Sequence, residues 1–252
     1  KLTAGKAARG DRSGCSVAID GNTVVVGAYY DYDDDAGPFS GLAYVFRTSD
    51  GGSTYTRVAT LMASDAAMWD RFGTSVAIDG ATIVIGTDYG EAAAYIFRTS
   101  DGGATYNQVA KLTAADAASS GSFGKSVAIA GGTIVIGAYG GEAAYVFRTT
   151  DGGATYGQVA KLTASDAAAN DYFGRSVAIS AGIIAIGAMG DVEGGGFGSG
   201  SVYLFHTEDD GATWSEFAFL IASDAAAEDY FGSSVAISGV RVVVGAYKDD
   251  DA

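Results

Sequence analysis

Three aspartates alternate with other residues in one short segment near the N-terminus. Asp31, Asp33 and Asp35 have the spacing of ligands in a calcium-binding loop, in which carboxylate oxygens converge on one cation. The twelfth position of such a loop, counted from Asp31, is Leu42, which offers no bidentate acid. The segment therefore allows two interpretations, a calcium site and a solvated charged loop. We expect no required cofactor, with calcium as the candidate ion.

Aromatic residues stand in segments where core packing does not obviously need them. A ring in such a place offers a flat apolar surface on which a sugar ring can stack. The candidate ligand-binding residues are Tyr30, Trp69, Tyr89, Tyr139, Tyr172 and Tyr230. The alternative for Trp69, Tyr172 and Tyr230 is that they cover the Phe-Gly pair that follows each of them.

No constellation of residues in the sequence resembles a catalytic centre. The single histidine, His206, stands where other copies of a repeated block carry Arg47, Arg98 and Arg148, and Cys15 occupies a slot that accepts many residue types. A nucleophile paired with histidine would need one of these positions, and a histidine-rich zinc site is excluded. The three repeated arginines are expected to point outward, which leaves no support for an arginine cluster of the sialidase type. We expect no catalytic residue and no enzyme activity.

Charge and hydropathy exclude several classes of partner. The chain has 252 residues, 30 of them acidic and 15 basic, and its net charge of -15 repels nucleic acid and anionic membrane surfaces. No apolar stretch approaches the roughly 20 residues that a membrane-spanning helix needs, so no membrane insertion is expected. The chain begins at Lys1 without methionine and stops part-way through a repeat, so we interpret it as part of something longer.

A block of sequence recurs along the whole chain, and the position of each candidate residue within its copy determines where that residue lies in the fold. Glycines mark the same point in successive copies, 59, 51, 50 and 58 residues apart: Gly14, Gly73, Gly124, Gly174 and Gly232. Such periods, with several short apolar runs in each, are typical of propellers and solenoids. The third copy predicts four antiparallel strands, which include residues 126–129, 133–136, 143–148 and 156–163. Four such strands per copy predict an all-β propeller built from four-stranded antiparallel blades.

We expect a single propeller domain over residues 1–252. It comprises four complete repeats, at about 14–72, 73–123, 124–173 and 174–231, and a partial repeat at 232–252, while Lys1–Ala4 is interpreted as the remnant of a fourth strand. In a closed ring these two leftovers would share one blade. The alternative is a larger ring whose other blades are absent from this chain.

Strand direction sorts the connections into two faces. Connections from the second to the third strand, and from the fourth strand to the next first strand, lie together on one face. This face receives the variable loops, most of the acidic residues and the candidate aromatics, and variable loops on a rigid scaffold are where recognition usually takes place. The tight turns lie on the opposite face.

The Phe-Gly pairs carry a resemblance to a known family. Phe72-Gly73, Phe123-Gly124, Phe173-Gly174 and Phe231-Gly232 are each followed by a Gly-Ala or Gly-Thr pair, and in this the chain resembles the FG-GAP repeats of integrin-type β-propellers. The calcium-binding repeats of that family carry a DxDxDG-type loop between their first two strands. Here that connection is a short turn such as Asp20-Gly21-Asn22, so the family's calcium cage is not carried over.

A second resemblance lies in the turn between the third and fourth strands. The stretches that begin at Thr48, Thr99, Thr149 and Thr207 match the Asp-box pattern S/T-x-D-x-G-x-T-W/Y/F. In sialidases and other secreted propellers such boxes are structural turns distant from the active site. Asp side chains of this kind hydrogen-bond backbone amides within their own turn. We therefore expect structural roles for Asp50, Asp101, Asp151 and Asp209.

These observations favour a non-enzymatic propeller, extracellular or at the cell surface, that acts in adhesion, recognition or surface assembly. Its expected partners are a protein or a glycan at a surface, with a larger assembly as a further expectation. The alternatives are a lectin with glycan sites repeated at each blade junction and, from another class, a sialidase-type enzyme acting on glycans.

Overall fold

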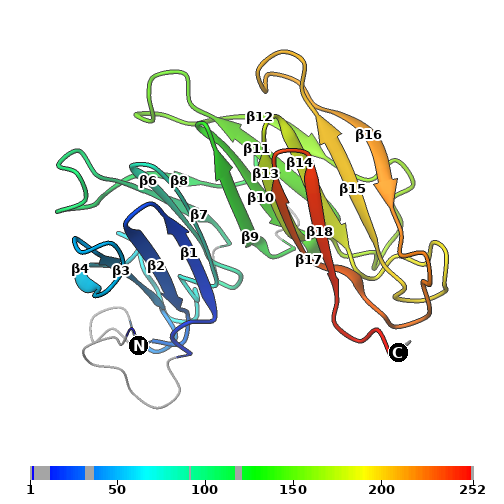
Figure 1. Ribbon diagram of the computed structural model, residues 1–252, viewed down its shortest axis with the longest axis horizontal. Coiled ribbons are helices and arrows are strands. Elements are labelled where there is room, and N and C mark those ends of the chain that lie inside the picture. The colour runs from blue at the N-terminus through cyan, green and yellow to red at the C-terminus, as the bar shows by residue number, and fades with distance from the viewer. Residues whose placement is uncertain (1, 3–11, 32–36, 91, 117–120, 251–252) are drawn as a thin grey trace.

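The chain folds as an open arc of β-sheets (Figure 1). The computed structural model describes residues 2, 12–31, 37–90, 92–116 and 121–250. Blade 1 contains β1 (Ser16–Asp20), β2 (Thr23–Ala28), β3 (Leu42–Arg47) and β4 (Thr56–Leu61). Blade 2 contains β5 (Ser75–Asp79), β6 (Thr82–Gly86), β7 (Ala94–Arg98) and β8 (Asn107–Leu112).

The later repeats follow the same plan. Blade 3 contains β9 (Phe123–Ala130), β10 (Thr133–Ala138), β11 (Ala143–Arg148) and β12 (Gly157–Leu162), with a 3-10 turn at Tyr139–Gly141. Blade 4 contains β13 (Phe173–Ser180), β14 (Ile183–Ala188), β15 (Ser201–His206) and β16 (Ser215–Leu220). The half-blade that ends the chain contains β17 (Phe231–Ser238) and β18 (Arg241–Ala246).

Every complete blade is an antiparallel sheet whose strands lie in chain order, and the first strand of each blade contacts the first strand of the next. The second strand carries a continuous β-branched run, as in Thr133–Ala138, and is buried on both faces. The outermost strand, as in Gly157–Leu162, is largely exposed. The structure confirms the predicted all-β propeller of four-stranded blades.

The hydrophobic core lies between blades. Each blade has a front, which faces the preceding blade, and a back, which faces the next one. Val84 on the back of blade 2 packs in one buried cluster with Phe123, Ile134 and Ile136 on the front of blade 3. The junctions between blades 1 and 2 and between blades 3 and 4 repeat this arrangement. No blade therefore buries its apolar faces alone.

The recurrent glycines allow the blades to approach closely. Ser126 of β9 donates its hydroxyl hydrogen to the backbone oxygen of Gly174, in the next blade, at 2.9 Å. A Cβ added to Gly137 would lie 2.0 Å from that same oxygen, so a side chain cannot be accommodated there. The same serine-to-glycine bond joins the other neighbours: Ser16 to Gly73, Ser75 to Gly124 and Ser176 to Gly232. The glycines of the Phe-Gly and Gly-Ala pairs thus form one inter-blade contact.

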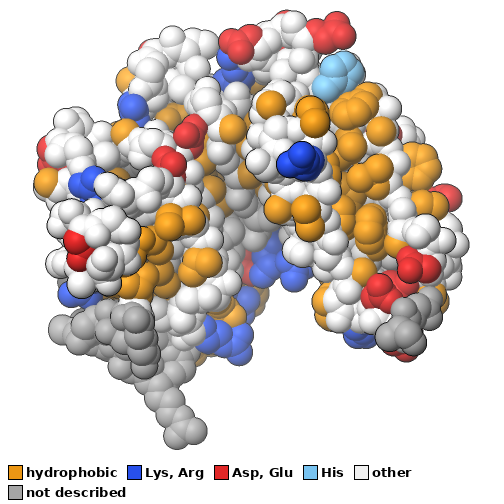
Figure 2. Space-filling model, viewed as in Figure 1, with side chains coloured by type: hydrophobic (Ala, Val, Ile, Leu, Met, Phe, Trp, Pro, Cys, Tyr) orange, Lys and Arg blue, Asp and Glu red, His pale blue; other side chains and the backbone are white. Residues whose placement is uncertain are grey.

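The two ends of the arc leave sheet faces open. Val17 on the front of blade 1 is 64% exposed, whereas its counterparts Val76, Val127 and Val177 are at most 9% exposed. Val243 on the back of the half-blade is 69% exposed, although the residues in its place in the other four blades are fully buried. Figure 2 shows hydrophobic side chains at the surface of both ends.

Only one residue of the predicted N-terminal strand remnant, Leu2, is described, and it lies beside blade 1. Leu2 lines a hollow with Val17, Ile19, Val24 and Val26 of blade 1, while the half-blade lies at the other end of the arc (Figure 1). The remainder of the predicted strand remnant, Lys1, Thr3 and Ala4, lies outside the described residues.

Candidate ligand-binding site

The loop-bearing face contains the β2–β3 type of connection and the connections between blades. Each inter-blade connection reverses sharply before its Phe-Gly pair, and the residue just before the phenylalanine has a left-handed backbone, as at Arg71 (φ 59°) and Tyr172 (φ 58°). Asp70, Asp171 and Asp229 stabilise these turns, because their buried carboxylates accept backbone hydrogen bonds from Ala67, Ala168 and Ala226 at 2.6 to 2.8 Å. Burial raises the pKa of Asp171 above its ordinary value.

A second set of carboxylates on this face joins neighbouring blades. The hydroxyl of Tyr203 in blade 4 lies 2.7 Å from a carboxylate oxygen of Asp166, which comes from the connection leaving blade 3. It lies at the same distance from Asp191. Burial, followed by these two hydrogen bonds, raises the pKa of Tyr203. Asp116 is bonded in the same way to Tyr145 and also to Lys161. Many acids of this face are therefore engaged in structural contacts.

At the axis of the arc, this face has a basic cavity. We call it the axial cavity; its volume is about 390 Å³, and it is lined by Arg12, Cys15, Tyr29, Tyr30, Arg71, Thr74, Asp88, Lys125 and Arg175. Figure 2 shows Lys and Arg side chains in the hollow of the arc. The lining contains four cationic groups and one carboxylate, Asp88, which lies 2.9 Å from the Lys125 ammonium and 3.9 Å from the Arg71 guanidinium.

Tyrosine rings hold the guanidinium groups of this cavity. Arg12 lies over the ring of Tyr30 at 4.4 Å and also donates a hydrogen bond to the Tyr29 hydroxyl, which raises the pKa of Arg12. Arg71 lies 4.7 Å from the ring of Tyr89 and 5.6 Å from that of Tyr30. Cation–π contacts of this kind fix the plane of a guanidinium group.

The sequence gives no support for an arginine cluster of the sialidase type, yet three arginines outside the repeated slot, Arg12, Arg71 and Arg175, line the axial cavity. Arg12 and Arg71 occupy the left-handed position before the Phe-Gly pair or its equivalent, and Lys125 and Arg175 stand at the start of the innermost strands. Both repeat positions, the one before the phenylalanine and the one at the start of the innermost strand, hold different residue types in different repeats. The sequence therefore gives no reason to expect that their side chains lie close together. Because the innermost strands of all blades begin near the axis, the fold brings together residues about 50 positions apart.

The predicted aromatic residues fall into three groups. Tyr30 lines the axial cavity, and Tyr89 and Tyr139 lie beside its arginines, Tyr139 at 5.9 Å from Arg175. Trp69 packs at 4.4 Å against Phe39. Tyr172 packs against Tyr139, from the β10–β11 connection, and Tyr230 packs against Tyr247, which follows β18, with ring centroids 5.8 and 5.3 Å apart. The structure therefore places Tyr30, Tyr89 and Tyr139 in or beside the axial cavity, with Tyr172 next to Tyr139.

The predicted calcium ligands are described only in part. Asp31 is buried, and one of its carboxylate oxygens accepts a hydrogen bond from the Tyr44 hydroxyl. Asp33 and Asp35 lie outside the described residues. Within the part of the chain that the structure describes, no three His, Cys, Asp or Glu side chains are grouped as metal ligands.

The opposite face contains the four turns whose sequences resemble Asp boxes. Asp50 accepts hydrogen bonds from the backbone N–H and the hydroxyl of Thr54 at 2.8 and 2.6 Å, and from the Thr48 hydroxyl at 2.7 Å. Equivalent bonds surround Asp101, Asp151 and Asp209. Bonds from these threonines lower the pKa of Asp50 and Asp209 to about 2, and lower the pKa of Asp101 and Asp151 as well.

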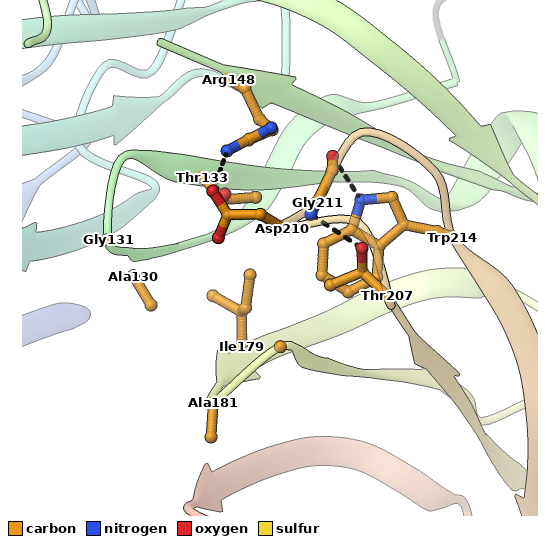
Figure 3. A pocket seen from close by; sticks show the side chains of 11 residues that line it. Ala130, Gly131, Thr133, Arg148, Ile179, Ala181, Thr207, Asp210, Gly211 and Trp214 are labelled. Carbon is orange, nitrogen blue, oxygen red and sulfur yellow. Dashed lines mark hydrogen bonds and ion pairs between the residues drawn. The ribbon is translucent and has the colours of Figure 1, made fainter. Parts of the chain in front are cut away.

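The repeated arginines reach toward the Asp-box turns of the next blade instead of pointing outward. Arg148 lies 3.2 Å from the Asp210 carboxylate. Both residues line a cavity of about 230 Å³ between blades 3 and 4 (Figure 3). Similar cavities recur at the two earlier junctions, beside Arg47 and Arg98. Their recurrence indicates a property of the blade junction. His206, in the corresponding slot of blade 4, lies on this face, away from the axial cavity.

Among the described residues, no helix has the length and hydropathy needed to cross a bilayer. No curated protein sequence matches this chain.

Solved structures with the same fold include two bacterial proteins. One is the periplasmic gluconolactonase PpgL of Pseudomonas aeruginosa, with a TM-score of 0.63 and 13% sequence identity over 91% of this chain. The other is a functionally unknown protein from Desulfotomaculum acetoxidans DSM 771, with a TM-score of 0.55 and 11% identity over 88% of this chain. The matched regions cover 64% and 59% of those chains, and at these identities the likeness extends to the fold alone. Because the FG-GAP repeat matches residues 1–46, 55–105, 106–156, 156–205 and 214–252, most of the sequence, the chain belongs to the FG-GAP repeat family.

Proposed function

We propose that this propeller is a non-enzymatic recognition module, extracellular or at the cell surface, whose loop-bearing face contacts a protein or a glycan. The axial cavity carries the proposal, because variable positions of successive repeats converge there to form an open, polar hollow. Residues that vary between otherwise similar repeats are free to serve recognition, since the structural positions are held constant. The net charge of -15 disfavours nucleic acid as a partner.

The position of the histidine supports a role without catalysis. His206 is the one histidine of the chain, and it lies on the face opposite the axial cavity. Cys15 lines the cavity but has no histidine there to act as its base. A nucleophile activated by histidine is therefore not assembled at this site.

One observation favours the alternative of a glycan-acting enzyme. The axial cavity contains three arginines together with Tyr29 and Asp88, and sialidases use a tyrosine as their nucleophile. In the structure, however, Asp88 is paired with Lys125 at 2.9 Å, and Tyr29 accepts a hydrogen bond from Arg12. Both groups are thus engaged in holding cations. We therefore place recognition first.

The test combines a glycan array, a panel of immobilised cell-surface proteins and a set of chromogenic glycosides that includes sialosides. We expect saturable binding to at least one immobilised glycan or protein, with no release of chromophore. Turnover of any glycoside would replace recognition by catalysis. Absence of binding across all surfaces would also contradict the proposal.

Calcium binding at Asp31, Asp33 and Asp35 stays a prediction. An ion that binds only the folded state stabilises it by about 2.7 kcal/mol at a hundredfold excess over its dissociation constant. The melting temperature in millimolar calcium should therefore exceed that in chelator. Identical melting curves would show that the segment is a solvated loop.

A further inference from the structure

We propose that the axial cavity binds the carboxylate of an acidic saccharide. This inference rests on the proposed recognition function and names the chemical class of its ligand. It draws on the charge of the cavity, on the orientation of its guanidinium groups and on its size.

The charge of the cavity is opposite to that of the chain as a whole. The protein carries a net charge of -15, yet four cationic side chains and one carboxylate line this hollow. Asp88 is shared by Lys125 and Arg71, whereas in the described part of the chain neither Arg12 nor Arg175 forms an ion pair with a carboxylate. Like charges held this close repel one another, so an anion in the cavity relieves an unfavourable interaction.

The guanidinium groups are arranged to meet an anion. The tyrosine rings occupy faces of Arg12 and Arg71, which leaves in-plane N–H groups as hydrogen-bond donors. Nε of Arg71 is buried and has no hydrogen-bond partner within the described structure. A buried donor without an acceptor is costly, and a ligand carboxylate would satisfy it. Because the rings already fix the side chains, binding requires little ordering.

The size and the remaining groups of the cavity favour a sugar. A volume of about 390 Å³ suits one or two sugar rings. Beside the cations, the Tyr29 hydroxyl can bond to sugar hydroxyls, and Tyr89, whose ring lies against Arg71, is 55% exposed and offers an apolar edge. Arginine clusters also recognise acidic peptide motifs, so a short acidic peptide is the comparison ligand in the titration. The size of the axial cavity and the exposed ring of Tyr89 beside it favour the saccharide.

Isothermal titration calorimetry with digalacturonate tests the proposal directly. We expect saturable binding that weakens as salt is added, because exposed ionic contacts are screened. The dimethyl ester of the same disaccharide, which lacks both charges, should bind at least about tenfold more weakly. The dipeptide Glu-Glu, with the same side-chain charge, should also bind more weakly than digalacturonate. Equal binding of dipeptide and disaccharide would overturn the assignment to a saccharide.

Variants locate the binding within the molecule. Arg71→Gln and Arg175→Gln should each weaken digalacturonate binding about tenfold or more, the loss of one charge-assisted contact. Arg57→Gln removes the same charge on the outer strand β4, far from the cavity, and should leave the affinity unchanged. Circular dichroism checks that each variant is folded, and Arg175→Gln serves if Arg71→Gln is not. Equal affinity in all three variants, or no binding of digalacturonate, would overturn the proposal.

The result is separable from that of the recognition function. Binding of neutral glycans or of a surface protein, without a preference for digalacturonate, would leave recognition standing and remove the acidic ligand. Turnover of a sialoside together with loss of digalacturonate binding in Arg175→Gln would retain the acidic ligand and remove the non-enzymatic role.

Discussion

Glycine at position 137 is required by the space around it. Its Cα faces the backbone oxygen of Gly174 in the next blade, and the hydroxyl of Ser126 approaches the same oxygen. Any Cβ at this position would displace one of the two blades. The glycines that mark the family's repeats thus act at blade junctions, which are the places where this protein buries its core.

Replacement of Gly137 by a residue with a side chain should lower the free energy of unfolding. Gly137→Ala places a methyl group 2.0 Å from a backbone oxygen, and overpacking of this kind should lower the free energy of unfolding by on the order of 3 kcal/mol. Gly157→Ala is the matched control, because nothing lies within 4 Å of a Cβ there. That change should stay within about 0.5 kcal/mol. Urea denaturation of both variants measures the difference, and equal midpoints would contradict the account.

The carboxylates of the Asp-box-like turns should make the melting temperature depend on pH in the acidic range. The folded state holds the pKa of Asp50 at about 2, below its ordinary value of 3.8, because Thr54 and Thr48 donate hydrogen bonds to the ionised form. This contribution is complete above the unfolded pKa and is lost as the pH falls through the folded one. Asp50→Asn should therefore lower Tm near neutral pH by a few degrees, the shift typical of one lost local bond. The difference from wild type should shrink between pH 4 and 2.

Asp250→Asn, which removes a charge outside any such turn, serves as the control for this measurement. A difference in Tm between Asp50→Asn and wild type that stays constant down to pH 2 would show that the carboxylate charge does not matter.

At the scale of the strand and the turn, the sequence predicts the fold well and the site poorly. The β-branched run of Thr133–Ala138 and the tight turns beside it identify strands, because both signals are local. The axial cavity depends instead on where distant strands begin. Arg71 and Arg175 occupy variable positions of their own repeats. They line the same cavity only because the blades are arranged around one axis. The outward direction expected for Arg148 is wrong because the next blade supplies Asp210 as its partner.

The phenylalanine at the start of each innermost strand should carry much of the junction's stability. Phe173 is fully buried and packs against Tyr203 and Phe205, with ring centroids 5.5 and 6.2 Å away. Phe173→Ala should cost about 3–5 kcal/mol of unfolding free energy. Phe197→Ala, at a ring that is 59% exposed in a loop, should cost about 0.5 kcal/mol or less. A similar loss in both variants, measured by calorimetry, would be contrary to the described packing.

At the scale of the whole molecule, the arc exposes a front and a back of the kind that its own junctions bury. The front of blade 1 carries Val17 and Ile19, and the back of the half-blade carries Val243. Similar surfaces meet at every internal junction, so two copies of the chain can meet in the same way. A front-to-back contact is heterologous, and such contacts lead to rings or filaments.

We expect this chain to associate with itself as its concentration rises. Val17→Lys and Val243→Lys should each weaken association, because each places a charge in an apolar contact. Val192→Lys, at a loop residue with 53% exposure, adds the same charge elsewhere and should not. Sedimentation velocity over a range of concentrations measures the effect. A wild-type chain that stays monomeric at the highest concentration would contradict the expectation.

Because the serine-to-glycine contact is the same at each blade junction, whole repeats can be gained or lost without creating a new kind of junction. Each junction uses the same chemistry, so removal of residues 73–123 would place Gly124 directly after Phe72 and bring Val25 against Ile134 and Ile136, the residues that Val84 meets now. The Ser16 hydroxyl would then find the Gly124 oxygen, as that of Ser75 does. An arc shortened by this repeat would keep the serine-to-glycine hydrogen bond and the hydrophobic packing at every junction. It would lose Asp88, the carboxylate of the axial cavity. Gain or loss of whole repeats is thus a route by which the electrostatics of the axis can change while the scaffold persists.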